Sequence, residues 1–441
     1  MKKILIMAPK MNGPGNERKF NSQWPLWLEK EVKNNLWNLV TPALLTLASL
    51  TDRSKYSIEL IDEEFQNVDI NTDYDIVAMY TITPNVKRAY DWAKYFRAKG
   101  SWVVLGGVHA SLIPTEAREF ADTVLVGEGE YIWPQFLKDF EKGKAQNLYM
   151  QSIGRVKIED SPLPAFDLIP ESARKIVPIQ TARGCPHGCR FCNVKSLYGD
   201  GYRSKSIERI DLEIKKAMEL CRGSTLYFTD DNLFCKKERA KKLLHVVRDY
   251  KVRWYTNSDL SFGMDEKFLK LAYKSGCRQV LIGFESVTAK NLRGIDQSNF
   301  KMRHIPLYHE VIERIQSNGI GVVGSFIVGL DGDDHGVFET LAEFIFRTKL
   351  YGVSITINTP YPGTESFKAM SSANRILTYD WDQYTIFQPV IKSTKMSNEE
   401  LNESYINLLK KINSPEYTAQ KLQYFKENIK NINIKEKIKW E

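Results

Sequence analysis

The sequence predicts an α/β protein with a doubly wound parallel sheet at its N-terminus, about six further β/α units after it, and a small C-terminal helical cap. Three observations predict this class. Short apolar runs alternate with helical stretches from residue 1 to about residue 140. The same alternation resumes after residue 173, and a purely helical period begins near residue 396. The predicted boundaries are 1–150 for the sheet domain, 151–172 for a linker, 173–395 for the second α/β domain and 396–441 for the helical region.

Length and charge restrict the class of protein further. A chain of 441 residues is too long for one ordinary core, and 43% hydrophobic residues are enough to build large cores. The net charge of +8 is mild for this length, and only the C-terminal segment "KLQYFKENIKNINIKEKIKWE" is visibly basic. A nucleic-acid-binding protein would need a concentrated basic face, so we do not expect nucleic acid as a partner.

The first nine residues, "MKKILIMAP", imitate a signal peptide. The apolar run is too short for that role and ends at Pro9 without a cleavage-like site, so we interpret it as a first β-strand. No stretch approaches 18 consecutive apolar residues, and a transmembrane helix is therefore not expected. We expect a cytoplasmic protein, in which clustered cysteines indicate metal binding or catalysis rather than disulfides.

Five apolar runs in the first third predict strands: "ILIM", "SIELI", "DIVAMY", "WVVLG" and "DTVLV". Helical stretches such as "ALLTLASL" and "NVKRAYDWAKYFRAKG" lie between most of them. Near-continuous apolar strands are typical of a parallel sheet covered on both faces. In such sheets, ligands bind beyond the carboxyl ends of the strands.

Unusual residues cluster at those strand ends. Glycines there allow close approach of the backbone to a large ligand. Each segment alone is also compatible with an ordinary turn or helix cap, but the three together favour a ligand site. The dinucleotide fingerprint G-x-G-x-x-G is absent after the first strand, which disfavours NAD and FAD. The candidates for cofactor binding are Thr81 and Thr83 in "TIT", Gly106, Gly107 and His109 in "GGVHAS", and Gly127, Glu128 and Gly129 in "GEGE".

The segment from Lys10 to about Val40 is unusually long for a loop and contains Trp24, Trp27 and Trp37. Loops longer than about 12–15 residues are usually functional or disordered, and three tryptophans argue against disorder. The segment is therefore expected either to cover a ligand or to form a hydrophobic clasp between domains.

After the proline-rich linker "IEDSPLPAFDLIP", three cysteines stand at the spacing C-x3-C-x2-C: Cys185, Cys189 and Cys192. Thiolates are soft ligands for zinc or iron–sulfur clusters. Structural zinc usually takes four ligands, and His187 is the available fourth. A [4Fe–4S] cluster held by three cysteines would keep one iron open for another ligand. Three merely packed cysteines fit poorly in so short a loop with two glycines and a proline.

Beyond residue 200, five runs predict strands: "TLYFTD", "VRWYTN", "RQVLIGFES", "GVVGSFIVGL" and "VSITINTPY". Polar residues follow these runs, and chemistry in β/α barrels collects at the carboxyl ends of strands. Each of these side chains could instead cap a helix. As a set they fit a ring of ligand contacts better: Asp230, Asp231, Asn232, Asn257, Ser258, Asp259, Glu285, Ser286 and Asn358.

The cysteine spacing, with the aromatic Phe191 before the last cysteine, resembles the radical S-adenosylmethionine (SAM) signature. The resemblance implies an open, partial (β/α)6 barrel and a [4Fe–4S] cluster on Cys185, Cys189 and Cys192. The open iron would bind SAM, which one electron cleaves to a 5′-deoxyadenosyl radical. The implied SAM-side contacts are Phe191, Asp230, Asp231, Ser258 and Glu285, with Asp231 toward the amine and Glu285 toward the ribose or carboxylate.

The order "LGGVHAS", "ADTVLVGEGE", proline-rich linker and C-x3-C-x2-C resembles the cobalamin-binding radical SAM family. The resemblance covers roughly residues 1–395 and includes "TPALLTLASL" and "TPYPGTESF". It implies a Rossmann-like cobalamin site made by the strand-end residues of the N-terminal domain. The motif D-x-H-x-x-G is absent, and His335 in "GDDHG" lies in the other domain. Cobalamin is thus expected without a protein histidine on cobalt, and His109 is expected to touch the corrin or its tail.

The stretch from residue 396 has a helical period, with Ser397 and Glu400 forming a capping box. In members of the family this region helps to shape the substrate side. It carries no motif here, and a purely stabilising element is the better interpretation.

The resemblance implies a cobalamin-dependent methyltransferase that uses the deoxyadenosyl radical and methylcobalamin to methylate an unactivated carbon. The alternative is the same fold used for ring contraction, cyclisation or oxidation without methyl transfer. A third hypothesis is a non-catalytic cobalamin or iron–sulfur sensor, against which the three cysteines and open iron argue. The expected partners are a small-molecule or lipid-like substrate and an external electron donor such as flavodoxin or ferredoxin.

Overall fold

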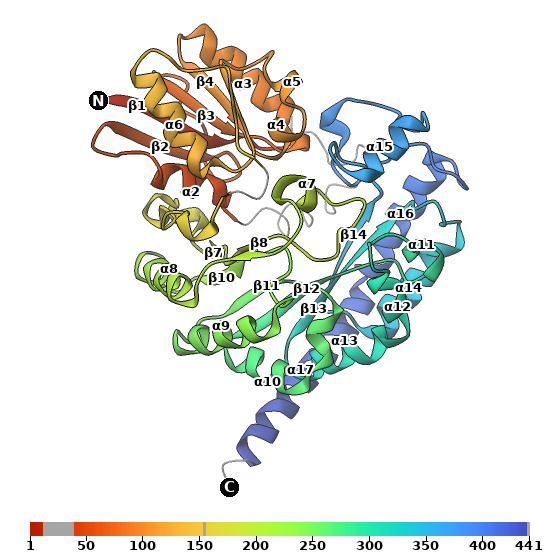
Figure 1. The fold of residues 1–441 in the computed structure, drawn as a ribbon. Helices are drawn as coiled ribbons and strands as arrows, with labels where there is room; N and C mark the ends of the chain where they lie inside the picture. Colours follow the sequence, from red (N-terminus) through yellow and green to blue (C-terminus); the bar gives the residue numbers. More distant parts are fainter. Residues whose placement is uncertain (12–38, 153–155, 439–441) are drawn as a thin grey trace.

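The computed structural model describes residues 1–11, 39–152 and 156–438. It contains two parallel sheets, with the cysteine-bearing segment and the short helix α7 (Val194–Tyr198) lying between them (Figure 1). The predicted α/β class is confirmed. The prediction that a tryptophan-rich segment covers a ligand or forms a clasp concerns Trp24, Trp27 and Trp37, which lie outside the described residues.

Within the described residues, the N-terminal sheet has six parallel strands in the order β2-β1-β3-β4-β5-β6. The five predicted strands are confirmed. Sequence reasoning missed the sixth, β6, because its three residues are too short for alternation to show. The strands are β1 (Lys2–Ala8), β2 (Tyr56–Asp62), β3 (Ile76–Tyr80), β4 (Trp102–Gly106), β5 (Thr123–Val126) and β6 (Leu148–Met150).

Helices cover both faces of this sheet, which explains its continuous apolar strands. Ile4 and Ile6 of β1 share a core with α2 (Pro42–Ser49) and α6 (Gly129–Glu141). The alternate residues, Leu5 and Met7, share a core with α3 (Val86–Ala98), α4 (Val108–Leu112) and α5 (Pro114–Ala117). The sheet is therefore doubly wound, and the strand order reverses between β1 and β3, where such sheets bind ligands beyond their carboxyl ends.

The second sheet also has six parallel strands among the described residues, in the order β14-β13-β12-β11-β10-β7. It confirms the predicted open (β/α)6 arrangement, because the edge strands β7 and β14 do not pair with each other in the described part of the chain. Its strands are β7 (Ile176–Ile179), β10 (Thr225–Phe228), β11 (Trp254–Ser258), β12 (Cys277–Glu285), β13 (Gly321–Val328) and β14 (Gly352–Ile357). The covering helices are α8 (Ile207–Leu220), α9 (Lys237–Asp249), α10 (Glu266–Lys274), α13 (Tyr308–Ser317) and α14 (Gly336–Thr348).

Two features connect the sheets. The proline-rich linker forms three short 3₁₀ helices, Ile158–Asp160, Phe166–Leu168 and Glu171–Ala173, and buries Phe166 in the larger core. After β14, the chain forms α15 (Glu365–Ser372) and returns to the first sheet, where Trp381 and Tyr384 join the core around α3 and α5. The first sheet and the barrel are thus held together on both sides of the cysteine-bearing segment (Figure 1).

The C-terminal region forms α16 (Asn398–Ile412) and α17 (Pro415–Ile438). The predicted capping box of Ser397 and Glu400 is present. Helix α16 packs on α14 and donates a hydrogen bond from buried Tyr405 to the Ile355 carbonyl at 2.8 Å. This packing favours the interpretation of α16 as a stabilising part of the barrel's outer layer.

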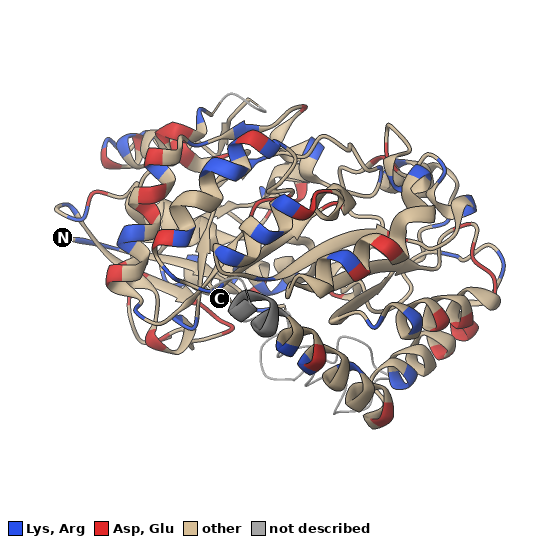
Figure 2. Ribbon diagram, turned by 90° about the horizontal axis from the view of Figure 1, so that it is seen from below, with Lys and Arg blue, Asp and Glu red and all other residues tan. Residues whose placement is uncertain are grey.

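Basic and acidic residues are interspersed over the helices seen in Figure 2. Among the described residues, no helix is both long enough and apolar enough to span a membrane.

Candidate functional site at the carboxyl ends of both sheets

The three clustered cysteines lie in one loop between the short strand β8 (Ala182–Arg183) and α7. β8 pairs with β9 (Arg203–Ser204). The loop follows β7, so it lies at the carboxyl end of the second sheet, where barrel chemistry collects. Its position between the two sheets places it within reach of ligands bound at either edge (Figure 1).

Backbone hydrogen bonds tie this loop to distant parts of the chain. Arg190 N donates to the Ile295 carbonyl at 3.0 Å, and Gln297 N donates to the His187 carbonyl at 3.1 Å. Ser366 N donates to the Arg190 carbonyl at 3.0 Å. The loop conformation therefore depends on two segments more than 100 residues away in the sequence.

Gly184, directly before the first cysteine, is a position that only glycine can occupy. Its φ is +101°, and a Cβ atom there would lie 2.1 Å from the Gly201 carbonyl oxygen. Its N–H donates to Asp231 Oδ2 at 3.1 Å, which connects the loop to the end of β10.

Burial raises the pKa of all three thiols, for Cys189 to about 12 and for Cys192 to about 11. Without a metal, the three thiols are therefore protonated at neutral pH. Among the described residues, no three His, Cys, Asp or Glu side chains are arranged as a ready metal site. Without a metal ion, no interaction draws the three protonated thiols together, because metal binding itself supplies the free energy that deprotonates and gathers the ligands.

The donor set nevertheless fits an iron–sulfur cluster better than zinc. Three soft thiols share one short loop, which matches a cluster with one open iron. The fourth zinc ligand weighed from the sequence, His187, is already engaged: its Nε2 lies 2.7 Å from Asp259 Oδ2. Burial opposes the ionisation of Asp259, but hydrogen bonds from His187, Ser261 and Asn232 hold its pKa well below the ordinary value. Recruiting His187 to zinc would break this network.

The polar residues after β10 divide into two roles. Asp230 is 1% exposed and accepts hydrogen bonds from Thr181 N at 2.7 Å, from Ala182 N at 3.1 Å and from the Thr181 hydroxyl. Asp231 instead faces the cysteine loop through its bond to Gly184. Asp230 therefore holds the segment leading to the loop, and of the two it is Asp231 that lies beside the cysteines.

Asp230 should make stability depend on pH. Burial raises its pKa from the ordinary value of 3.8 to about 6. Because the folded-state value is the higher one, this group stabilises the fold fully below about pH 4, and the contribution is lost as the pH rises through about 6. Asp230→Asn should therefore remove about 2–3 kcal/mol of the difference in unfolding free energy between pH 4 and pH 7. Urea unfolding at both pH values measures it.

A second buried carboxyl group, Asp333, contributes the same kind of pH dependence to both the variant and the parent protein. Burial also raises the pKa of Asp333 to about 6, and this residue is unchanged in the variant. A pH dependence that is equal in Asp230→Asn and the parent protein would show that Asp230 does not titrate in this range.

Glu285, at the end of β12, has an uncommon backbone conformation and a buried partner. Its φ is +62°, which is rare for a residue other than glycine. Lys301 Nζ lies 3.1 Å from Glu285 Oε1 and also donates to the Gly283 carbonyl. Burial opposes the charge of Lys301, but the Glu285 carboxylate keeps the pKa of its ammonium above the usual range. The neighbouring Phe300 ring on α12 (Phe300–His304) lies 4.7 Å from the His187 ring, so α12 brings this pair beside the cysteine loop.

The two remaining predicted SAM-side residues lie near this region. Ser258 is buried at the end of β11, and its hydroxyl donates to the Asp259 carbonyl at 3.1 Å. Phe191 is partly buried against the larger core. The structure therefore brings Asp231, Glu285 and the cysteines around one loop, and keeps Ser258 at the next strand end.

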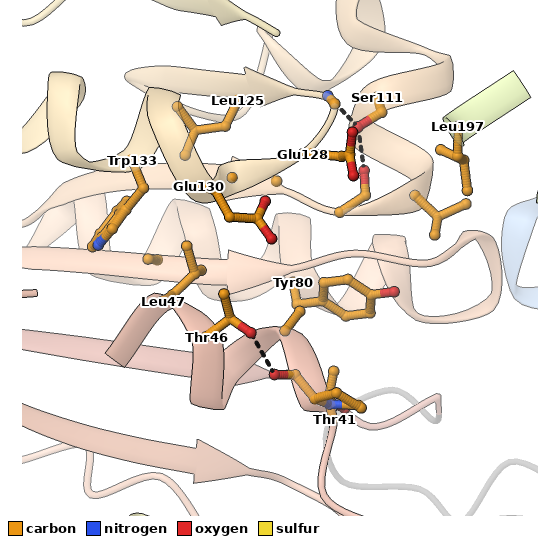
Figure 3. Close-up of a pocket in the computed structure, with 18 of the residues that line it drawn as sticks. Thr41, Thr46, Leu47, Tyr80, Ser111, Leu125, Glu128, Glu130, Trp133 and Leu197 are labelled. Carbon is orange, nitrogen blue, oxygen red and sulfur yellow. Dashed lines mark hydrogen bonds between the residues drawn. The ribbon is translucent and has the colours of Figure 1, made fainter. Parts of the chain in front are cut away.

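A pocket with a cavity volume of about 290 Å³ lies beyond the carboxyl edge of the N-terminal sheet (Figure 3). Residues of α2, β3, β4 and the turns after β4 and β5 line it, and α7 closes it from the barrel side. Most of its wall is apolar. The lining includes Thr41, Thr46, Leu47, Tyr80, Gly106, Gly107, Ser111, Leu125, Gly127, Glu128, Gly129, Glu130, Trp133, Gln180, Arg183, Leu197, Tyr198 and Thr229.

The predicted N-terminal contacts divide sharply between this pocket and the sheet interior. Gly106, Gly107, Gly127, Glu128 and Gly129 all line the pocket. Gly107 has φ +96°, and a Cβ there would lie 2.7 Å from the Thr81 carbonyl oxygen, so only glycine allows this approach.

Thr81, Thr83 and His109 are not among the lining residues. Thr81 is fully buried and donates to the Gly106 carbonyl. His109 Nδ1 lies 3.2 Å from the Thr83 hydroxyl, and the imidazole contacts Glu116 and Trp381. These residues hold the sheet edge and the returning segment together, on the opposite face from the pocket.

Two residues that sequence reasoning missed, Arg183 and Tyr198, connect the pocket to the cysteine loop. Arg183 Nη1 donates to Glu128 and Nη2 donates to Glu130, both at 2.6 Å. Arg183 stands two residues before Cys185, and Tyr198 on α7 lies against its guanidinium. On the barrel side, sequence reasoning also missed Lys301, which pairs with Glu285. No motif identified them, because an isolated Arg, Tyr or Lys is ordinary until the fold places it.

A family model described as the radical SAM superfamily matches residues 179–345. The chain is 28% identical over 418 residues to bacteriochlorophyllide d C-12(1)-methyltransferase of Chlorobaculum tepidum, a match covering 92% of this chain and 90% of that protein. Two solved structures have the same fold. The cobalamin-dependent SAM radical enzyme OxsB, with aqua-cobalamin and SAM bound, matches with a TM-score of 0.67 at 13% identity, covering 97% of this chain and 71% of that one. The radical SAM methyltransferase TsrM from Kitasatospora setae, with cobalamin and a [4Fe–4S] cluster, matches with a TM-score of 0.63 at 15% identity, covering 85% and 78%.

Proposed function

The chain belongs to the radical SAM superfamily, and we propose that it is a cobalamin-dependent methyltransferase that methylates an unactivated carbon of a small molecule. One observation carries the proposal beyond the family. The cysteine loop and the sheet-edge pocket share a wall, because Arg183 begins the loop and is bonded to Glu128 and Glu130 of the pocket. Radical generation and methyl donation require two cofactors within reach of one substrate. The shared wall supports this arrangement, because it makes the two candidate cofactor sites adjacent.

On the barrel side, Cys185, Cys189 and Cys192 would hold a [4Fe–4S] cluster, which supplies the electron for reductive cleavage of SAM. Asp231 and Glu285 lie beside the loop and would orient the amine and the ribose or carboxylate of SAM. Glu285 is buried and Asp231 is half-buried, and the limited access of water strengthens such contacts. An external flavodoxin or ferredoxin would deliver the electron.

On the N-terminal side, the pocket would hold cobalamin, which supplies the methyl group to be transferred. The glycines at 106, 107, 127 and 129 have no side chains, so a large flat ligand can approach the backbone closely there. No histidine is found among the described residues that line the pocket. This supports binding with the lower base displaced and without a protein histidine on cobalt.

The test is anaerobic and needs no knowledge of the substrate's identity to begin. The full chain is reconstituted with iron, sulfide and hydroxocobalamin, and SAM and a strong reductant are added. We expect both 5′-deoxyadenosine and S-adenosylhomocysteine by mass spectrometry, because one SAM supplies the radical and a second remethylates cobalt. Deoxyadenosine without S-adenosylhomocysteine from cobalamin-loaded protein would contradict methyl transfer and favour rearrangement or oxidation.

A further inference from the structure

One carboxylate oxygen of Glu128 accepts no hydrogen bond from the described residues. The Glu128 side chain is 4% exposed and lines the pocket, yet its Oε2 atom has no hydrogen-bond partner among the residues that the structure describes. Buried carboxylate oxygens are rarely left in this state, because an unsatisfied charged acceptor costs more than a neutral one. Figure 3 shows the Glu128 carboxylate near Ser111 of α4, at the pocket wall.

The other oxygen determines what Oε2 can accept. Glu128 Oε1 receives Arg183 Nη1 at 2.6 Å and Arg203 Nη2 at 3.0 Å. A carboxylate between two guanidinium groups is an acceptor only, and it has no proton to offer a ligand. The group that meets Oε2 must therefore donate a hydrogen, as a carboxamide N–H does and a carboxylate cannot.

The rest of the described lining offers no cation to balance an anionic ligand at this wall. Arg183 is its one Lys or Arg residue, and the structure already engages three of its nitrogens, with Gln180, Glu128 and Glu130. An incoming carboxylate would face Glu128 without a free partner, and like charges in a buried site repel strongly.

We propose that Glu128 selects the cofactor's amidation state: the pocket takes a corrinoid whose periphery carries neutral carboxamides and rejects one that carries carboxylates. This inference rests on the proposed function, because it assumes that a corrinoid fills the pocket. It adds a specificity-determining residue and states the chemistry of the group that residue binds.

The test compares two ligands on the apo form of the full chain. Cobinamide, which carries amides, and cobyrinic acid, which carries carboxylic acids, are titrated at pH 7.5 and followed by their visible absorption. We expect cobinamide to bind at least about tenfold more tightly. Equal affinity would overturn the selection by Glu128 while leaving the corrinoid site intact. Binding of neither ligand would overturn the proposed cofactor as well.

Two matched variants separate Glu128 from a general preference for uncharged ligands. Glu128→Gln puts an amide in place of the acceptor-only oxygen, and the affinity gap should shrink to within about threefold. Glu130→Gln removes one charge from the same arginine but leaves Glu128 Oε2 in place, so the gap should persist. An unchanged gap in Glu128→Gln, with a far-ultraviolet circular dichroism spectrum matching the parent, would overturn the proposal.

Discussion

A Cys189→Ala variant is expected to form no 5′-deoxyadenosine above the level of a reaction without enzyme. The reason is the ligand count: the loop offers three thiols, and a cluster with one open iron needs all three. Burial raises the pKa of Cys189 to about 12, as expected for a thiol that needs a metal to ionise. Replacing it with alanine keeps the loop's backbone contacts, which involve Arg190, Gln297 and Ser366, so the fold should survive. Iron and sulfide content after anaerobic reconstitution should fall well below about four per chain.

The matched control is Cys221→Ala. Cys221 is 1% exposed and directly follows the last residue of α8. Its sulfur lies 4.0 Å from the Phe166 carbonyl, outside the cysteine loop. It should retain both the cluster and deoxyadenosine formation, because a buried cysteine acts as a small apolar side chain. Deoxyadenosine formed by Cys189→Ala at the rate of the parent protein would show that the loop does not hold the cluster used for SAM cleavage.

Sequence reasoning performed best where the signal is local. Some features are encoded within a few neighbouring residues. They are the continuous apolar strands, the loop C-x3-C-x2-C and the glycines around Gly107 and Gly127. The presence of two α/β domains and their succession along the chain followed from such signals. The strand β6 did not, because three residues cannot show a period.

Site residues could not be predicted from the sequence where their roles depend on contacts with distant parts of the chain. Thr83 and His109 follow the predicted strands, but they lie in the helical turns after β3 and β4, and their side chains face away from the pocket. There His109 meets Trp381, more than 250 residues later in the chain. Arg183 and Lys301 became significant only through partners contributed by other elements. A single sequence contains the residues of such pairs but not the pairing.

The buried pair of Lys301 and Glu285 gives the second large prediction. Lys301→Met should lower the free energy of unfolding by about 3–5 kcal/mol, because it leaves the Glu285 carboxylate buried without its cation. Both residues are less than 10% exposed, and Nζ lies 3.1 Å from Oε1. Urea unfolding of the full chain, followed by tryptophan fluorescence, measures the change.

Two further variants assign the loss to the stranded charge. The double variant Lys301→Met with Glu285→Gln should recover at least half of the stability, since no uncompensated charge remains. Lys270→Met breaks an exposed pair with Glu266 on α10, whose side chains are 54% and 59% exposed. That control should change the unfolding free energy by less than about 0.5 kcal/mol.

The same pair bears on the site, because Glu285, whose φ is +62°, lies near the cysteine loop and its carboxylate is paired with Lys301. If burial of the charge is what matters, the single variant is unstable and the double variant is stable. If the geometry of Glu285 matters for SAM, the double variant should be stable and still bind SAM at least about tenfold more weakly in an anaerobic equilibrium titration. A stable double variant with unchanged SAM affinity would remove Glu285 from the SAM site and leave the pair a purely structural role.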